Sequence, residues 1–147
     1  MNFFDWREQR GEKADEETER LAAAVIGAAI EVHRHLRGGH LEKSYKLAMC
    51  RELELRGVPF GCEVTTEVCY KGRCLGVERI DLLVGGRLIV ELKSVERLTE
   101  THRAQALGYL AVTGLRLALL INFNVPALRL GIKRVVNDDL TAPTKPG

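Results

Sequence analysis

The stretch from Ile80 to Lys93, IDLLVGGRLIVELK, places the strongest constraint on how this chain can fold. Two apolar runs flank a Gly-Gly pair, and this pattern predicts a β-hairpin. Three ionisable residues, Asp81, Glu91 and Lys93, nevertheless interrupt the apolar runs. Charged side chains are rarely buried without partners, so their relative positions decide what the hairpin can do.

The register of the hairpin determines whether these residues meet, because side chains alternate between the two faces of a strand. A strict two-residue turn pairs Asp81 with Val90 and sends Glu91 to the opposite face. A three-residue loop over residues 85–87 pairs Asp81 with Glu91. Only the second register separates an apolar face from a charged one. The apolar face then holds Ile80, Leu82, Val84, Leu88, Val90 and Leu92, and the other face holds Arg79, Asp81, Leu83, Ile89, Glu91 and Lys93. We therefore expect the three ionisable residues to cluster.

Two neighbouring carboxylates repel each other by about 4 kcal/mol at ~4 Å and an effective dielectric near 20. A shared proton, a nearby cation or a metal ion relieves this repulsion. Lys93 already supplies a cation on the same face, so a structural ion-pair cluster is the alternative to a functional site.

The remaining pattern predicts a mixed α/β domain with a central β-sheet flanked by helices, in the order α-α-β-β-β-α-β-β. We expect a single domain over residues 16–137, a flexible N-terminal arm over 1–15 and a flexible tail over 138–147. The expected helices cover about 15–37, 40–56 and 99–114, and the expected strands cover about 63–70, 73–84, 87–95, 116–123 and 131–136.

Composition permits several classes of partner and excludes a membrane span. The formal net charge of +2 allows a nucleic-acid partner without requiring one. The longest apolar stretch, Leu21 to Ile30, is half of the roughly 20 residues that a membrane-spanning helix needs. The N-terminus lacks the apolar core of a signal peptide, so we predict a cytoplasmic protein.

The four cysteines, Cys50, Cys62, Cys69 and Cys74, form no C-x-x-C pair, which argues against zinc. A turn at Lys71-Gly72 places Cys69 opposite Cys74, where a disulfide is geometrically possible. A reducing cytosol argues against that bond, and we expect two unpaired, half-buried strand residues.

Several of these residues match a known family. Asp81 followed by Glu91-Leu92-Lys93 resembles the D…(D/E)-x-K signature of the PD-(D/E)XK nuclease superfamily, whose fold is restriction-endonuclease-like. The segment from Gly39 to Tyr45 resembles the G-x-x-E-x-x-Y pattern of the GxxExxY family within that superfamily. Gln105 and Tyr109 are similar to the Q-x-x-x-Y element of its RecB-like branch. Ile80 replaces the proline of the superfamily name.

This resemblance implies a nuclease that hydrolyses phosphodiester bonds in DNA or RNA with Mg²⁺, for which Mn²⁺ can substitute. Asp81, Glu91, the Leu92 carbonyl and Glu42 are the implied metal site. Oxygen ligands suit Mg²⁺, and a divalent ion both activates water and stabilises phosphate charge. Lys93 is the implied catalytic lysine, and Gln105 and Tyr109 complete the implied catalytic set.

Nucleic acid is the expected partner. The residues expected to contact it are Arg79, Arg97, Arg103, Lys43, Gln105 and Tyr109, with Lys46 as a further basic candidate. A homodimer is also expected, since cutting both strands of a duplex requires two sites. The alternative function is a nucleic-acid-binding or assembly module of the same fold without turnover.

Overall fold

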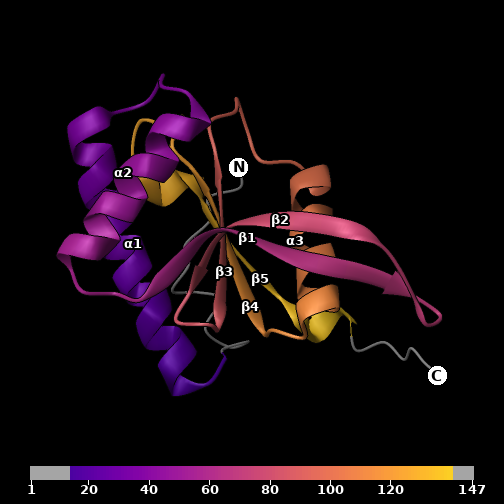
Figure 1. Cartoon of the computed structure of the whole chain (residues 1–147). Helices are drawn as coiled ribbons and strands as arrows, with labels where there is room; N and C mark the ends of the chain where they lie inside the picture. Colours follow the sequence, from indigo (N-terminus) through magenta and orange to yellow (C-terminus); the bar gives the residue numbers. More distant parts are fainter. Residues whose placement is uncertain (1–13, 141–147) are drawn as a thin grey trace.

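The computed structural model describes residues 14–140, and these contain the predicted elements in the predicted order (Figure 1). The elements are α1 (Glu16–Leu36), α2 (Glu42–Leu55), β1 (Phe60–Tyr70), β2 (Arg73–Val84), β3 (Leu88–Lys93), α3 (Glu100–Thr113), β4 (Leu117–Asn122) and β5 (Ile132–Val136), with short 3₁₀ helices η2 (Leu128–Gly131) and η3 (Asn137–Leu140). The predicted mixed α/β fold is thus confirmed. Within residues 14–140, no helix is long and apolar enough to cross a membrane.

The five strands form one sheet in the order β1-β2-β3-β4-β5. Only β3 and β4 are parallel, and α3 is the crossover connection between them. The carboxyl ends of β3 and β4 therefore lie at the same edge of the sheet. This edge carries the residues that follow Lys93 and Asn122.

Helices cover both faces of the sheet (Figure 1). One hydrophobic cluster joins α1 and α2 to one face, and a smaller cluster joins α3 to the other. All six residues of β4 are buried, as expected for a central strand covered on both faces. Glu91 of β3 is nevertheless buried between these layers, so it needs polar partners within the fold.

The ends of the helices follow the local sequence signals. Asp15 is the N-cap of α1, and its carboxylate accepts a hydrogen bond from the Thr18 amide at 2.9 Å. Thr99 and His102 form a capping box at the start of α3. Gly114 ends α3 in the left-handed conformation, with φ 74°.

The β2–β3 hairpin has the register of a three-residue loop. Leu82 pairs with Val90, and Val84 pairs with Leu88. Both glycines of the loop take positive φ angles, 60° at Gly85 and 70° at Gly86, which few other residues adopt. The register predicted from the apolar pattern is confirmed.

One expected member of the apolar face lies elsewhere. Ile80 packs in the cluster beneath α3, whereas Leu82 packs beneath α1 and α2. The ribbon is irregular here, because Glu63 lies between the Cys62–Leu82 and Val64–Ile80 pairs with a φ of 53°. Ile80 also lies beyond Leu82–Val90, the last pair between β2 and β3, where β2 stays paired with β1 alone. Counting by parity along the β2–β3 hairpin therefore fails for Ile80.

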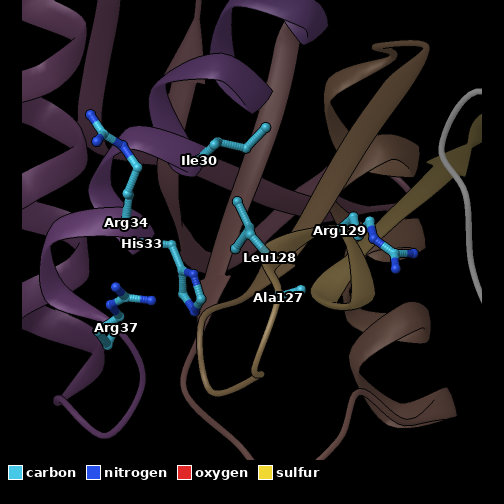
Figure 2. A pocket seen from close by; sticks show the side chains of 7 residues that line it. All are labelled: Ile30, His33, Arg34, Arg37, Ala127, Leu128 and Arg129. Atoms are coloured by element: carbon cyan, nitrogen blue, oxygen red, sulfur yellow. The ribbon is translucent and has the colours of Figure 1, made fainter.

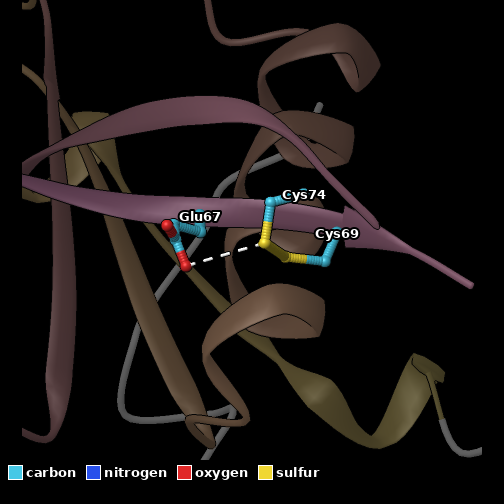
Figure 3. The surroundings of a disulfide bond; sticks show 3 residues. All are labelled: Glu67, Cys69 and Cys74. Atoms are coloured by element: carbon cyan, nitrogen blue, oxygen red, sulfur yellow. Dashed lines mark hydrogen bonds between the residues drawn. A yellow bond between two sulfur atoms is a disulfide. The ribbon is translucent and has the colours of Figure 1, made fainter. Parts of the chain in front are cut away.

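The tip of the β1–β2 ribbon contains a disulfide bond between Cys69 and Cys74 (Figure 3). The predicted turn at Lys71-Gly72 is present and places the two cysteines directly opposite each other, with Cα atoms 3.9 Å apart. The expectation of unpaired, half-buried cysteines is therefore wrong, since both residues are bonded and exposed.

The predicted arm and tail fall mostly outside residues 14–140. At the carboxyl end, residues 137–140 form η3, and the Arg116 guanidinium pairs with the Asp138 carboxylate there. Asp15, the last residue of the predicted arm, is the cap of α1.

Candidate active site

A fork between β2 and β3 holds the predicted acidic residues. The β2–β3 pairing ends at Leu82–Val90, whereas β2 continues to pair with β1 as far as Tyr70–Arg73. Beyond Leu82 the β1–β2 ribbon leaves the central sheet on the side where α3 lies (Figure 1). Asp81 and Glu91 stand at the point of separation, one on each branch.

The two carboxylates replace the backbone hydrogen bonds that the separating strands lose. Glu91 Oε2 accepts a hydrogen bond from the Asp81 amide, and Asp81 Oδ2 accepts one from the Leu92 amide, both at 2.9 Å. This reciprocal arrangement fixes both side chains relative to the backbone of the opposite strand. The predicted register therefore brings the two acidic groups together.

Glu91 is the more buried of the pair, with 3% of its surface exposed. Burial and, after it, the negative charge of Asp81 together raise the pKa of its carboxyl to about 7. The Asp81 amide, Lys93 and Lys46 oppose this effect only in part. Glu91 is thus a carboxyl group that a cation at the fork would help to ionise.

Lys93 follows Glu91 on the face of β3 that α3 covers. Its ammonium group donates a hydrogen bond to Gln105 Oε1 on α3 at 3.2 Å. One turn further along α3, the Tyr109 hydroxyl donates to the Arg79 carbonyl at 3.1 Å. Burial raises the pKa of Tyr109 to about 12, with Glu91 the next cause. The structure therefore gathers Lys93, Gln105 and Tyr109 around the acidic pair.

A second lysine, Lys46 of α2, reaches the fork from the other face. Its Nζ lies 2.6 Å from Glu63 Oε2 and 3.6 Å from Asp81 Oδ1. The hydrogen bond to Glu63 raises the pKa of Lys46, and the same bond lowers the pKa of Glu63. Sequence reasoning placed Lys46 only among general basic contacts. Its position one turn after Glu42 is the signal that puts both side chains on one helix face.

The G-x-x-E-x-x-Y segment organises the turn between α1 and α2. Gly39 has a φ of 95°. The hydroxyl of Tyr45, which is fully buried, donates to the Arg37 carbonyl and accepts from the His40 amide. The Glu42 carboxylate accepts from the Ser94 amide at 3.2 Å, and the Ser94 hydroxyl donates to the His40 carbonyl at 2.7 Å. This turn is therefore fastened to the residue that follows Lys93.

Asn122 holds the same edge of the sheet from β4. Its side chain is buried, accepts from the Val95 amide at 3.0 Å and donates to the Val95 carbonyl at 2.9 Å. Sequence reasoning identified neither Ser94 nor Asn122. The only signal for Asn122 was a polar residue at the end of an otherwise apolar strand.

The predicted nucleic-acid contacts are distributed unevenly. Arg79 lies 3.6 Å from Glu63 Oε1, beside the fork. Lys43 is exposed on α2, and its charge contributes to lowering the pKa of Glu63. Arg97 is exposed in the connection between β3 and α3, and Arg103 lies 4.0 Å from Glu100 in the first turn of α3. Arg79 and Lys43 thus lie close to Glu63, as Lys46 does, whereas Arg97 and Arg103 lie toward α3.

A separate basic hollow of about 300 Å³ lies between α1 and η2 (Figure 2). Three arginines line it around an apolar floor, and none of its lining residues belongs to the fork. The lining residues are Ile30, His33, Arg34, Arg37, Ala127, Leu128 and Arg129. The imidazole of His33 is buried and bonded to the Val125 carbonyl at 2.9 Å. Sequence reasoning did not predict this hollow.

The fork suits a hard divalent cation. Its donors are carboxylate oxygens, which Mg²⁺ prefers, and a bound cation would offset the burial and like charge that raise the pKa of Glu91. Among residues 14–140, Glu42, Asp81 and Glu91 are not a trio whose ligand atoms all lie within 4.8 Å of one another. Glu67, Cys69 and Cys74 do meet this spacing, but the sulfurs of Cys69 and Cys74 are bonded to each other.

Comparison with known proteins gives the family to which this α/β fold and its acidic fork belong. The family model described as the PD-(D/E)XK nuclease superfamily matches residues 19–135. The chain belongs to the PD-(D/E)XK nuclease superfamily. No protein of curated function matches it at a significant level.

A solved structure supports the same fold. The crystal structure of SSO0001 is similar to this chain with a TM-score of 0.51 and 19% sequence identity. The match covers 85% of this chain and 61% of that one, so this chain spans less than two thirds of SSO0001. At this identity the likeness concerns the fold alone.

Proposed function

We propose that the protein is a divalent-metal-dependent nuclease that hydrolyses phosphodiester bonds in DNA or RNA. The observation that carries this proposal is the reciprocal bonding of Asp81 and Glu91 at the β2–β3 fork, with Lys93 next to them. An ion-pair cluster needs no such geometry, because it gains nothing from burying a second carboxylate beside the first.

Asp81, Glu91 and the Leu92 carbonyl would hold the ion, with Mg²⁺ preferred and Mn²⁺ able to replace it. When bound, the ion supplies a water that ionises near neutral pH and a positive charge against the phosphate oxygens. The Lys93 ammonium would orient the attacking water and steady the charge that develops on the phosphate. Gln105 holds the Lys93 ammonium in place, and Glu42 fixes the following residue, Ser94.

The motifs support a finer placement in the GxxExxY family and the RecB-like branch. The three fixed residues of G-x-x-E-x-x-Y, which are Gly39, Glu42 and Tyr45, each have a distinct structural role at the turn that leads into α2. Gln105 and Tyr109 of the Q-x-x-x-Y element both face the fork from α3. We assign this function to a domain of residues 16–137.

Nucleic acid would approach the fork past Arg79 and Lys43, and Arg97 and Arg103 extend the basic surface toward α3. A homodimer would supply the second site that a double-strand cut requires. Light scattering at high protein concentration tests this, and a monomer mass would contradict it.

The decisive experiment incubates the protein with a mixed panel of single-stranded, duplex and branched DNA and RNA in Mn²⁺. Cleavage that disappears in Asp81→Asn supports the nuclease. A catalytically silent binding module would bind these nucleic acids and the metal without cutting. Stoichiometric Mn²⁺ binding, measured by calorimetry, separates both from a structural ion-pair cluster.

A further inference from the structure

The Glu63 carboxylate lies between two cations beside the fork. Its Oε2 is 2.6 Å from Lys46 Nζ, and its Oε1 is 3.6 Å from Arg79 Nη1. The Lys46 ammonium is also 3.6 Å from Asp81 Oδ1. Each oxygen of Glu63 therefore faces a different positive charge, next to a proposed metal ligand.

The backbone presents Glu63 in an unusual way. Its φ of 53° lies in the left-handed region, which residues other than glycine seldom adopt. Glu63 is also the β1 residue opposite Asp81, between two regular pairs. The conformation turns this carboxylate toward Lys46 of α2, across the branch that bears Asp81.

Two cations spaced around a pair of oxygens form a receptor for a phosphodiester as well as for a carboxylate. A phosphodiester offers two charged non-bridging oxygens, and lysine and arginine are the usual side chains that bind them. An anion held there would also lie next to Asp81, where hydrolysis is proposed to occur.

We infer that Lys46 and Arg79 form a phosphate-binding pair of the active site, and that Glu63 occupies the phosphate position in the free protein. Substrate binding then exchanges one anion for another: the phosphodiester takes the place of the Glu63 carboxylate between Lys46 and Arg79. Glu63 thereby lowers the affinity for nucleic acid and disfavours weakly held, non-specific polyanions. This inference rests on the proposed nuclease function, and it adds the substrate contact and a built-in competitor.

The first measurement is binding without cleavage. Inorganic phosphate is titrated into the metal-free protein, with backbone amide NMR shifts at residues 46, 63 and 79 as the readout. A fluorescent oligonucleotide is then bound at several salt concentrations. Glu63→Gln keeps the shape of the side chain and removes its charge, so both affinities should rise by about fivefold, the range of a partly exposed ion pair. Glu67→Gln, on the same strand and exposed, is the matched control and should change neither.

Lys46→Met should weaken both affinities by about tenfold and reduce the salt dependence of oligonucleotide binding by about one counterion. Lys46→Arg keeps the charge and should retain most of the binding, which separates loss of the contact from loss of folding. Thermal unfolding of each variant verifies that the fold is retained.

The outcomes separate the two proposals. If the parent cleaves nucleic acid and Glu63→Gln binds no more tightly, or Lys46→Met no more weakly, the phosphate pair is refuted and the nuclease stands. If phosphate binds with the expected pattern of variants but no substrate is cleaved, the pair stands and the nuclease fails. If phosphate shifts none of the three amides in any variant, the phosphate pair is refuted.

Discussion

Glu91→Gln should stabilise the metal-free protein at alkaline pH, although it removes a residue of the proposed active site. Burial and the charge of Asp81 raise the pKa of Glu91 from 4.5 to about 7. Between these two values the folded protein binds a proton that the unfolded chain releases, so stability falls as pH rises through this window. Glutamine keeps the acceptor for the Asp81 amide and cannot ionise.

The magnitude follows from the same pKa difference. At about 1.4 kcal/mol per pH unit, the rise to about 7 corresponds to roughly 3 kcal/mol, lost in the parent protein and retained in the variant. Of this, about 2–3 kcal/mol should appear between pH 5 and 8. Above pH 8 the difference between the two proteins should no longer change.

Urea unfolding of the parent and of Glu91→Gln, in EDTA at a series of pH values, measures this difference directly. Titrating groups that do not interact with the Glu91 charge cancel in the subtraction. Glu96→Gln, at an exposed position in the loop after β3, is the control. A difference that stays constant with pH, or a variant less stable than the parent at pH 8, would show that Glu91 is not held in a charge-disfavouring site. Mn²⁺ should restore the alkaline stability of the parent, which has the Glu91 carboxylate, and should leave Glu91→Gln unaffected.

Three further changes test other parts of the structure. Lys93→Ala should abolish cleavage while calorimetry shows equal or tighter Mn²⁺ binding, because a cation next to two carboxylates is removed; cleavage at the parent rate would refute its catalytic role. Tyr45→Phe should cost about 1 kcal/mol in urea unfolding, since it leaves the Arg37 carbonyl without its donor, and an unchanged midpoint would contradict this. Gly131→Ala should lower stability by about 1–3 kcal/mol in thermal unfolding, because an added Cβ collides with the Asn122 carbonyl oxygen; a melting temperature equal to that of the parent would show that the backbone relaxes there.

Much of the proposed site could be predicted because it depends on one hairpin. The alternation of apolar and charged residues selected the three-residue loop, and that loop brings Asp81 to Glu91. The spacing of Gln105 and Tyr109 placed both on one face of α3, and α3 lies over that branch of the fork. These predictions needed only the periods of a strand and a helix.

Other parts of the site escaped prediction because they join segments far apart in the chain. The spacing of Lys46 from Glu42 puts both side chains on one face of α2. It does not indicate that Lys46 reaches Asp81, or that Lys46 pairs with Glu63, whose backbone is left-handed. The location of Ile80 beneath α3 was also missed, because Ile80 lies beyond the last pair between β2 and β3. The turn at Lys71-Gly72 correctly predicted that Cys69 and Cys74 lie opposite each other. The disulfide between them was not expected, because a reducing cytosol was assumed.

The sequence by itself determined the order of elements, the helix ends at Asp15, Thr99 and Gly114, and the hairpin register, because caps, turns and face alternation are properties of neighbouring residues. Only the tertiary structure decided that the β1–β2 ribbon separates from β3 at Asp81. This separation lies between α2 on one face of the sheet and α3 on the other. It opens the fork and lets side chains from both helices converge on the same pair of carboxylates.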